Sequence, residues 1–280
     1  MKRGGHETLT FSSRAWKSGG HRGQVTIFII LGIVIVGGVS LAILVLSGKL
    51  PSIGKSASQN PESFLASCLA DTLKNGLQTL GLQGGYVSNP LNISYKLTNE
   101  KNPVDISYLC YSQMDGQFCV NQDPSLIKTF ESQMEIYSKT DVKNCFDSLI
   151  TNLKKQGYGV TSNYNNFSIK LDSGKLSLTI FADVTVSKGE VSSRYTNFTI
   201  QASTQMYNML RVAQEIVNKE ATTCDFSQDP YSYPNIFDYP DFNINKYYNS
   251  LDSSKIYSIK DDKTNEEFRF ATRGCVFPPL

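Results

Sequence analysis

Six cysteines are the residues of this sequence whose type and spacing carry the clearest chemistry. They are Cys68, Cys110, Cys119, Cys145, Cys224 and Cys275. A zinc site would need closely spaced CxxC-type pairs, which this sequence lacks, whereas an even number of cysteines favours disulfides, here three. Cys110 and Cys119 flank the turn residues Met114-Asp115-Gly116. We therefore expect this pair to close a hairpin.

The remaining four cysteines do not define their partners by spacing alone. We expect Cys68 to pair with Cys145 between two helices, and Cys224 to pair with Cys275 around the C-terminal region. Other connectivities and free buried thiols stay open at this point.

Residues that could serve as catalytic bases are scarce. The two histidines, His6 and His21, both lie near the N-terminus, which removes Ser-His-Asp and Cys-His catalysis from the rest of the chain. The sequence contains no GxSxG, GxxxxGK[ST] or Rossmann glycine motif. We interpret the carboxylate pairs Asp261-Asp262 and Glu266-Glu267 as solvated turn charges, not as a glycosidase acid and base. We expect no catalytic centre, no cofactor and no metal.

A stretch rich in Tyr, Asp, Asn and Pro covers residues 225–251 and has no regular period. Tyrosines beside acids suit recognition of a glycan or of another protein, because the ring is apolar while the hydroxyl forms hydrogen bonds. The alternative, which we favour for the stretch as a whole, is a loop held by its prolines that packs its own tyrosines onto the sheet. The recognition candidates are Tyr231, Tyr233, Tyr239, Tyr247 and Tyr248.

The same stretch contains a partial match to a calcium-binding loop. Lys246 occupies the position where the loop requires glycine, and Asp252 replaces the long glutamate that completes the coordination. We therefore do not expect a calcium site. The side chains at the ligand offsets are Asp241, Asn243, Asn245, Tyr247, Asn249 and Asp252.

Three Asn-X-Ser/Thr sequons begin at Asn92, Asn166 and Asn197. Around Asn166 and Asn197 the apolar residues alternate with polar ones, and both asparagines fall in the polar phase of a predicted strand. Glycans at these positions would disturb no core contact. We therefore treat all three asparagines as glycosylation candidates.

An uncharged apolar stretch covers residues 25–46, with Thr26 and Ser40 as its only polar side chains. Its 22 residues would measure about 33 Å as a helix, which is long enough to span a bilayer. The preceding residues carry five Lys or Arg and one Glu, a net charge of 5 − 1 = +4. The positive-inside rule then predicts a cytoplasmic N-terminus and an exported remainder. Gly38 and Ala42 allow self-association through this helix.

This orientation divides the chain into four parts. We expect a basic leader at 1–23, a transmembrane helix at 24–47, a Gly- and Ser-rich tether at 48–59 and an extracellular domain at 60–280, with a subdivision near residue 157. The whole chain has a net charge of +2, from 27 basic and 25 acidic residues. Because no global basic field exists, we do not expect binding to nucleic acid.

The junction Arg22-Gly23-Gln24, directly before the apolar run, resembles an archaeal class III, prepilin-type signal sequence. That resemblance implies cleavage between Gly23 and Gln24, although Phe28 stands where prepilins usually carry Glu. The chain also resembles uncharacterised single-pass surface proteins of DPANN-type archaea, in residues 23–32, around Cys68 and residues 80–86, and around Cys145. The resemblance implies a plasma-membrane surface protein. We expect a non-catalytic binding domain that contacts an envelope component or another cell, with a filament subunit as the alternative.

The elements that must position these residues form an α+β pattern. We predict helices at 61–84, 124–137, 141–156 and 203–220 from their apolar stripes. Strict alternation predicts a strand at 176–186, which a turn at 187–190 joins to a strand at 191–202, and residues 167–171 form a third strand. The helix at 203–220 is expected to cover the dry face of this antiparallel sheet. Residues 255–260 and 267–272 predict a further hairpin.

Overall fold

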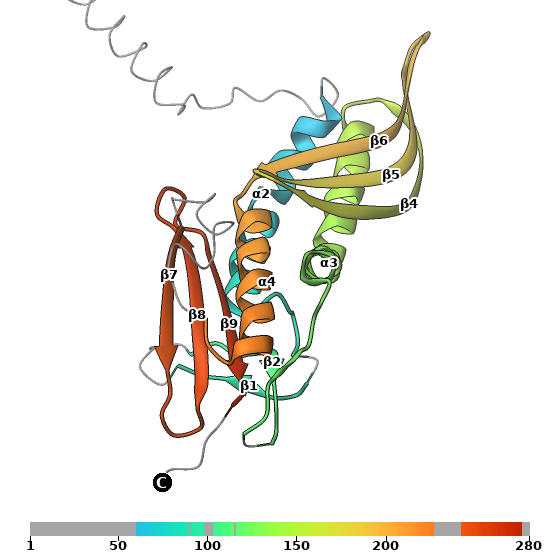
Figure 1. Ribbon diagram of the computed structural model, residues 1–280. Coiled ribbons are helices and arrows are strands. Elements are labelled where there is room, and N and C mark those ends of the chain that lie inside the picture. The colour runs from blue at the N-terminus through green and yellow to red at the C-terminus, as the bar shows by residue number, and fades with distance from the viewer. Residues whose placement is uncertain (1–59, 90, 98–102, 115, 227–241, 276–280) are drawn as a thin grey trace, which may run out of the picture. The chain divides into compact units, whose positions relative to one another are not determined.

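A computed structural model describes residues 60–89, 91–97, 103–114, 116–226 and 242–275 (Figure 1). Residues 55–280 form one unit, and the expected leader, membrane helix and tether lie outside the described residues. The α+β class is confirmed. In chain order the elements are α2 (Pro61–Leu82), β1 (Ser94–Tyr95), β2 (Ile106–Tyr111), β3 (Val120–Asn121), α3 (Leu126–Lys155), β4 (Gly159–Asp172), β5 (Lys175–Lys188), β6 (Val191–Ser203), α4 (Met206–Thr223), β7 (Phe242–Tyr248), β8 (Ser254–Asp261) and β9 (Glu267–Arg273).

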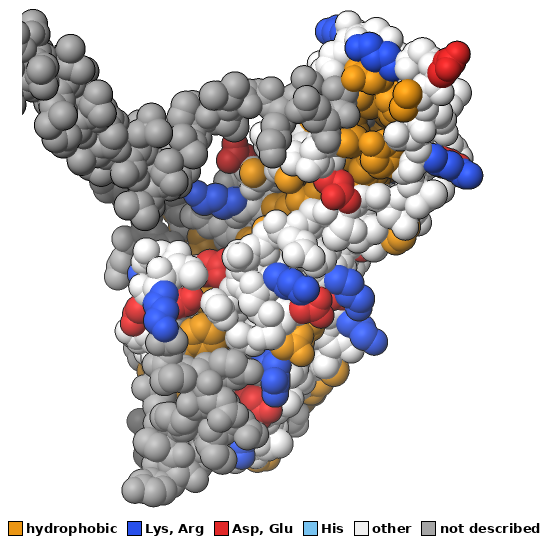
Figure 2. Space-filling model, turned by 90° about the horizontal axis from the view of Figure 1, so that it is seen from above, with side chains coloured by type: hydrophobic (Ala, Val, Ile, Leu, Met, Phe, Trp, Pro, Cys, Tyr) orange, Lys and Arg blue, Asp and Glu red, His pale blue; other side chains and the backbone are white. Residues whose placement is uncertain are grey.

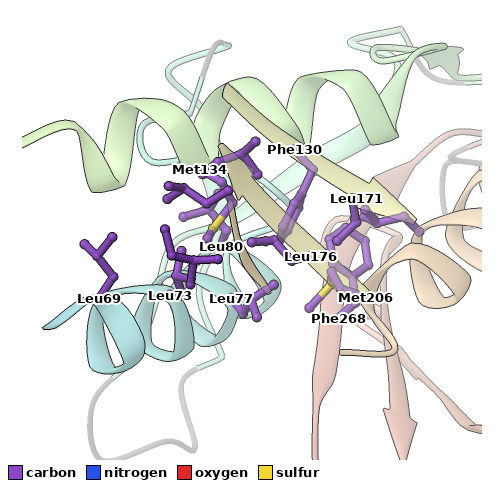
Figure 3. Close-up of a cluster of buried hydrophobic side chains, with 14 of the residues drawn as sticks. Leu69, Leu73, Leu77, Leu80, Phe130, Met134, Leu171, Leu176, Met206 and Phe268 are labelled. Atoms are coloured by element: carbon purple, nitrogen blue, oxygen red, sulfur yellow. The ribbon is translucent and has the colours of Figure 1, made fainter. Parts of the chain in front are cut away.

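Helix α2 begins and ends where its sequence signals predict. The Oδ1 atom of Asn60 accepts a hydrogen bond from the backbone N–H of Ser63 at 3.1 Å, and Pro61 fills the first helical position. The helix stops before Gly84, whose φ of +77° is a conformation that favours glycine. One stripe of leucines on α2 is buried against the domain core (Figure 3).

Strands β4, β5 and β6 form a three-stranded antiparallel sheet, as the alternation predicts. On β5 the buried positions alternate with less buried ones over most of its length. Strand β4 is longer than the predicted 167–171, because residues 159–166 continue the pairing with β5 although they are too polar to show an apolar period. Turns at Gly174 and Gly189 connect the three strands.

Helix α3 is a single helix, so the prediction of two helices at 124–137 and 141–156 was wrong. In the structure the Oγ of Ser138 bonds back to the carbonyl of Met134 at 2.7 Å, and the carboxylate of Asp141 accepts a hydrogen bond from Thr72 on α2 at 2.9 Å. Asp141 is therefore engaged by a neighbouring helix, and α3 is continuous through this point.

The free edges of the three-stranded sheet are met by glutamates from the helices. On β4, the backbone N–H groups of Ile169 and Leu171 donate to Glu135 at 2.9 Å and to Glu131 at 2.8 Å, both from α3. On β6, the N–H of Thr199 donates to Glu62 of α2 at 3.4 Å. These carboxylates occupy edge donors that another strand could otherwise use.

The second sheet has six strands in the order β1-β2-β9-β8-β7, with β3 also pairing with β2. The expected β8–β9 hairpin is confirmed. The sheet is mixed, because β2 and β9 run parallel, so the purely antiparallel expectation needs correction. Strand β7 was not predicted. Its Phe242 and Ile244 pack against the main core while Asn243 and Asn245 alternate with them, a period too short to stand out in the sequence.

Helix α4 does not cover the sheet that we expected it to cover. It packs mainly against β9, β8 and β2, while the dry face of β4–β6 is covered by α2 and α3 (Figure 1). Phe146 of α3 lies over that face, with its ring centroid 5.2 Å from Tyr164 on β4 and 6.4 Å from Phe198 on β6. The two sheets share one main core, which contains residues from both sides of position 157.

Candidate functional site

Three disulfides join all six cysteines, in the same pairs that the sequence favoured. They are Cys68–Cys145, Cys110–Cys119 and Cys224–Cys275, with Cα–Cα distances of 5.9, 5.3 and 5.8 Å. These distances lie in the ordinary range for disulfides. The first joins α2 to α3, the second closes the β2–β3 hairpin, and the third ties the end of α4 to the segment after β9.

A hollow of about 450 Å³ opens beside the Cys224–Cys275 disulfide. The ring of Tyr248 is 54% exposed there. The Tyr248 hydroxyl donates to the Oγ of Ser253 at 3.3 Å. The lining includes Thr223, Asp225, Lys246, Tyr248, Ser253 and Lys255. The hollow therefore combines an accessible aromatic ring with hydrogen-bond donors and acceptors.

The ion pairs of this hollow balance one another. Lys246 contacts the Asp225 carboxylate at 2.7 Å and donates to the carbonyl of Phe226 at 3.1 Å. Lys255 contacts Glu220 at 2.8 Å, and the Glu220 side chain is only 2% exposed. Among the described residues of the hollow the two cations are matched by two carboxylates, so these four side chains carry no net charge.

The buried carboxylate of Glu220 holds the floor of the hollow in place. It accepts hydrogen bonds from the Tyr257 hydroxyl at 2.5 Å and from the backbone N–H of Phe226 at 3.0 Å. Burial, with the adjacent Glu220 charge, raises the pKa of Tyr257 well above its usual range. Because every oxygen of Glu220 is engaged, the end of α4 and the Cys224 turn are fixed against β8.

Tyr247 and Tyr248, the two recognition candidates among the described residues, lie on opposite faces of the second sheet. Tyr248 faces the hollow, and Tyr247, 48% exposed, is the adjacent strand residue and so points to the opposite face. Tyr231, Tyr233 and Tyr239 lie outside the described residues. The loop interpretation is wrong for residues 242–248, which form β7.

The face of Tyr247 carries further tyrosines that the sequence reasoning did not single out. Burial and the neighbouring Tyr247 raise the pKa of Tyr95. The rings of Tyr108 and Tyr111 meet edge-on at 5.1 Å, and the Arg273 guanidinium lies 5.9 Å from the centre of Tyr111. The frequency of tyrosine around residues 95–111 was the available signal, but most of these rings pack on β2 and β8 as a small second core.

The three sequons have different surroundings. Asn166 and Asn197 are exposed on the outer face of the three-stranded sheet, whereas Asn92 lies in a turn with φ of +53°. Gly23 and Gln24, the candidate processing residues, lie outside the described residues, as do Gly38 and Ala42.

The calcium-like pattern and the carboxylate pairs take structural roles. Residues 242–248 are extended in β7, so their side chains cannot wrap around one ion. Among the described residues no cluster of three or more His, Cys, Asp or Glu is placed to hold a metal. The interpretation of solvated turn charges was wrong for Asp261, which is 2% exposed and accepts hydrogen bonds from Lys263 N at 2.9 Å and from Thr264 Oγ1 at 2.8 Å. Glu267 lies on β9 and pairs with Arg269 at 2.5 Å.

Surface charge over the described residues is mixed. Figure 2 shows Lys and Arg side chains alternating with Asp and Glu on the face seen from above, with hydrophobic side chains between them. Within the described ranges, no helix is both long enough and apolar enough to span a bilayer.

Compared with models of protein families, with curated proteins and with solved structures, the chain matches none.

Proposed function

We propose that the protein is a membrane-anchored cell-surface protein whose non-catalytic, disulfide-linked domain binds a neutral glycan in the hollow beside Tyr248. The observation that carries the surface location is the pairing of all six cysteines into three disulfides, each located after the apolar stretch at 25–46. Disulfides of this kind persist in oxidising compartments, whereas cytosolic thiols are kept reduced.

The apolar stretch and its basic leader supply the topology. A helix of 22 uncharged residues preceded by a net charge of +4 favours retention of the leader in the cytoplasm. The domain that begins at Asn60 is then exported, which agrees with the redox state that its cysteines need. The charge of the leader and the oxidised state of the cysteines therefore both support an extracellular domain, and they do so for independent physical reasons.

The hollow favours a neutral sugar over a charged ligand. Lys246 and Lys255 are matched by Asp225 and Glu220, so an acidic or basic ligand would have to displace an existing ion pair. An exposed ring such as Tyr248 can pack against the C–H face of a sugar, while Ser253 and Asp225 offer hydrogen bonds to its hydroxyl groups. An exposed ring beside charge-balanced hydrogen-bonding groups fits a glycan better than it fits a charged protein surface.

The topology is tested by adding a protease to intact cells that express the full chain with an N-terminal tag. We expect the folded domain to be digested, after reduction of its disulfides if necessary, while the tag stays protected. Protection of the domain in intact cells, together with its digestion in lysed cells, would contradict export.

Glycan binding is tested with the full chain, in detergent micelles, on a panel of neutral hexose, neutral N-acetylhexosamine and uronic-acid oligosaccharides. We expect binding to neutral members, with an affinity loss of at least about tenfold for Tyr248→Ala, the usual size for an anchoring aromatic. Tyr247→Ala is the matched control, because Tyr247 has similar exposure on the opposite face. Absence of binding to the whole panel, or equal loss in both variants, would refute the site.

A filament subunit is the second candidate, and the Gly23-Gln24 junction is the observation that favours it. Prepilin-type processing would produce a mature chain that starts at Gln24. Mass determination of the N-terminal peptide separates the two functions in part, since an intact Met1 excludes processing and with it the filament.

A further inference from the structure

The outer face of the three-stranded sheet places two sequons side by side. Asn166 on β4 pairs with Phe181 on β5, and Phe181 pairs with Asn197 on β6. Residues paired directly across strands project from the same face, and strands lie about 4.8 Å apart, so the two asparagines stand about 10 Å from each other with Phe181 between them.

The hydroxyl residues of both sequons occupy the next row of the same face. Ser168 and Thr199 each pair with Thr179 of the central strand, and the hydroxyls of Thr179 and Thr199 are 3.4 Å apart. The residues between asparagine and hydroxyl point the other way, and Phe198 is fully buried. Each sequon therefore places its asparagine and its hydroxyl residue on the outer face, where Asn166, Asn197 and Thr199 are exposed and Ser168 is half-buried.

Phe181 is an apolar residue on an otherwise polar face. It is 36% exposed, and its neighbours along the same face of β5 are Thr179 and Asp183, the latter paired with Arg194 at 2.5 Å. Nothing among the described residues covers the ring completely. An aromatic ring flanked by two sugar acceptors has the chemistry to pack against the C–H face of an attached sugar.

From this arrangement we propose that Asn166 and Asn197 are paired N-glycosylation sites whose innermost sugars pack on Phe181 and cover the outer face of the sheet. At each site the side-chain amide nitrogen forms a bond to the anomeric carbon of a sugar carried by a polyprenyl-phosphate donor, the sugar–phosphate bond breaks, and the lipid phosphate leaves with the amide proton. The inference rests on the proposed export of the domain, because glycosylation of this type is a modification of secreted proteins. It is independent of glycan binding at the Tyr248 hollow.

The third sequon differs in its geometry, so we assign it no glycan. Asn92 has a left-handed backbone conformation, and its N–H donates to the carbonyl of Asn89 at 3.3 Å. The hydroxyl of Ser94 is bonded to the Asp105 carboxylate and the residue is half-buried in β1. The turn at Asn92 and the bond from Ser94 to Asp105 therefore both engage this sequon within the fold.

Peptide mapping by mass spectrometry tests the proposal on the full chain purified from membranes of the cells that naturally make it. The chain carries an added Asn-Gly-Thr reporter in a flexible C-terminal extension. We expect more than half occupancy at Asn166 and at Asn197 and little at Asn92. The glycan mass on Asn166 should be lost in Ser168→Ala, and that on Asn197 in Thr199→Val. An occupied reporter with both asparagines empty would overturn the proposal alone, whereas an empty reporter would overturn the export on which it rests.

Contact between the sugars and Phe181 is tested by nuclear Overhauser effects in protein with ring-labelled phenylalanine. We expect signals from one ring to the innermost sugars, which disappear in Phe181→Ser while the occupancy of both sites is retained. If the glycosylated protein shows no such signals, the packing part of the proposal is refuted.

Discussion

The carboxylate of Glu131 accepts a hydrogen bond from the backbone N–H of Leu171 at 2.8 Å, and so a helix side chain replaces the missing neighbour of an edge strand. The Glu135 carboxylate accepts a corresponding hydrogen bond from the backbone N–H of Ile169, two residues earlier on β4. Edge strands with open donors attract other strands. The three-stranded sheet is protected against that outcome on β4 by two carboxylates spaced one helical turn apart.

Removing this protection should weaken the fold and promote association. In Glu131→Ala/Glu135→Ala two edge N–H groups lose their partners, and each loss costs about 1–3 kcal/mol where the group stays buried. We expect a lower urea midpoint and concentration-dependent association in analytical ultracentrifugation. Glu190→Ala, in the exposed β5–β6 turn, is the control and should change neither. A monomeric double variant with unchanged stability would show that the carboxylates do not protect the edge.

A glycine pair on α2 offers a matched test of helix packing. A Cβ at Gly81 would overlap the backbone carbonyl of Glu267 on β9, whereas one at Gly76 would lie 3.0 Å from side-chain atoms only, the flexible end of Met134 and the ring edge of Tyr137. We expect Gly81→Ala to lower the free energy of unfolding by about 1–3 kcal/mol. Gly76→Ala should stay within about 1 kcal/mol of the parent, because better helix propensity offsets the side-chain shift. Equal effects in denaturant titrations would refute the close approach of α2 to β9.

The disulfides should differ in their contributions to stability. In the chain-entropy description, a bond that closes 77 residues contributes about 4.5 kcal/mol and one that closes nine contributes about 2.6 kcal/mol. We therefore expect Cys68→Ala/Cys145→Ala to destabilise the domain more than Cys110→Ala/Cys119→Ala. Thermal unfolding of both double variants measures the order, and the reverse order would contradict it.

Buried tyrosines should make the fold sensitive to alkali. Burial raises the pKa of Tyr86 above its ordinary value of 10, with further upward effects from the Asp123 charge and the hydrogen bond to Asp123. The folded protein then holds a proton that the unfolded chain releases, so stability is full below about pH 10 and falls as the pH rises beyond it. The slope is about 1.4 kcal/mol per pH unit for each such group.

The variant Tyr86→Phe should lower stability at neutral pH, because its hydrogen bond to Asp123 at 2.9 Å is lost. It should also reduce the steepness of the alkaline limb in unfolding titrations between pH 9 and pH 12, chosen to bracket the ordinary value of 10. Tyr248→Phe, at an exposed position, serves as the control. An unchanged alkaline limb in Tyr86→Phe would show that the buried Tyr86 hydroxyl does not cause the loss of stability at high pH.

Local signals in the sequence predict most of the first sheet and its helices. The strict alternation on β5 and the Asn60-Pro61 cap of α2 depend on neighbouring residues only, and the structure follows them. The break expected between residues 137 and 141 is absent, and Asp141 there bonds to Thr72, which is 69 positions away in the sequence. A local pattern cannot show that a side chain has such a tertiary partner.

The partner of α4 and the order of the second sheet depend on distant contacts. An apolar stripe such as that of Met206 and Leu210 fits any sheet of suitable width, so the sequence could not show which sheet it covers. The parallel β2–β9 pair joins strands from opposite ends of the domain. The hollow could not be predicted from the sequence for the same reason. Lys246 and Asp225 are 21 positions apart in the sequence, and only the folded sheet brings them into contact.

The Cys68–Cys145 bond lies about two helical turns into α2, close to the point where the chain enters the domain. A mechanical pull on an anchored N-terminal segment would unwind those first turns and then meet a covalent link to α3. The tension would then pass through this bond into α3 and the sheet packed on it. The part of α2 after Cys68 would stay folded. A domain held in this way would resist unfolding by tension applied at its N-terminal end.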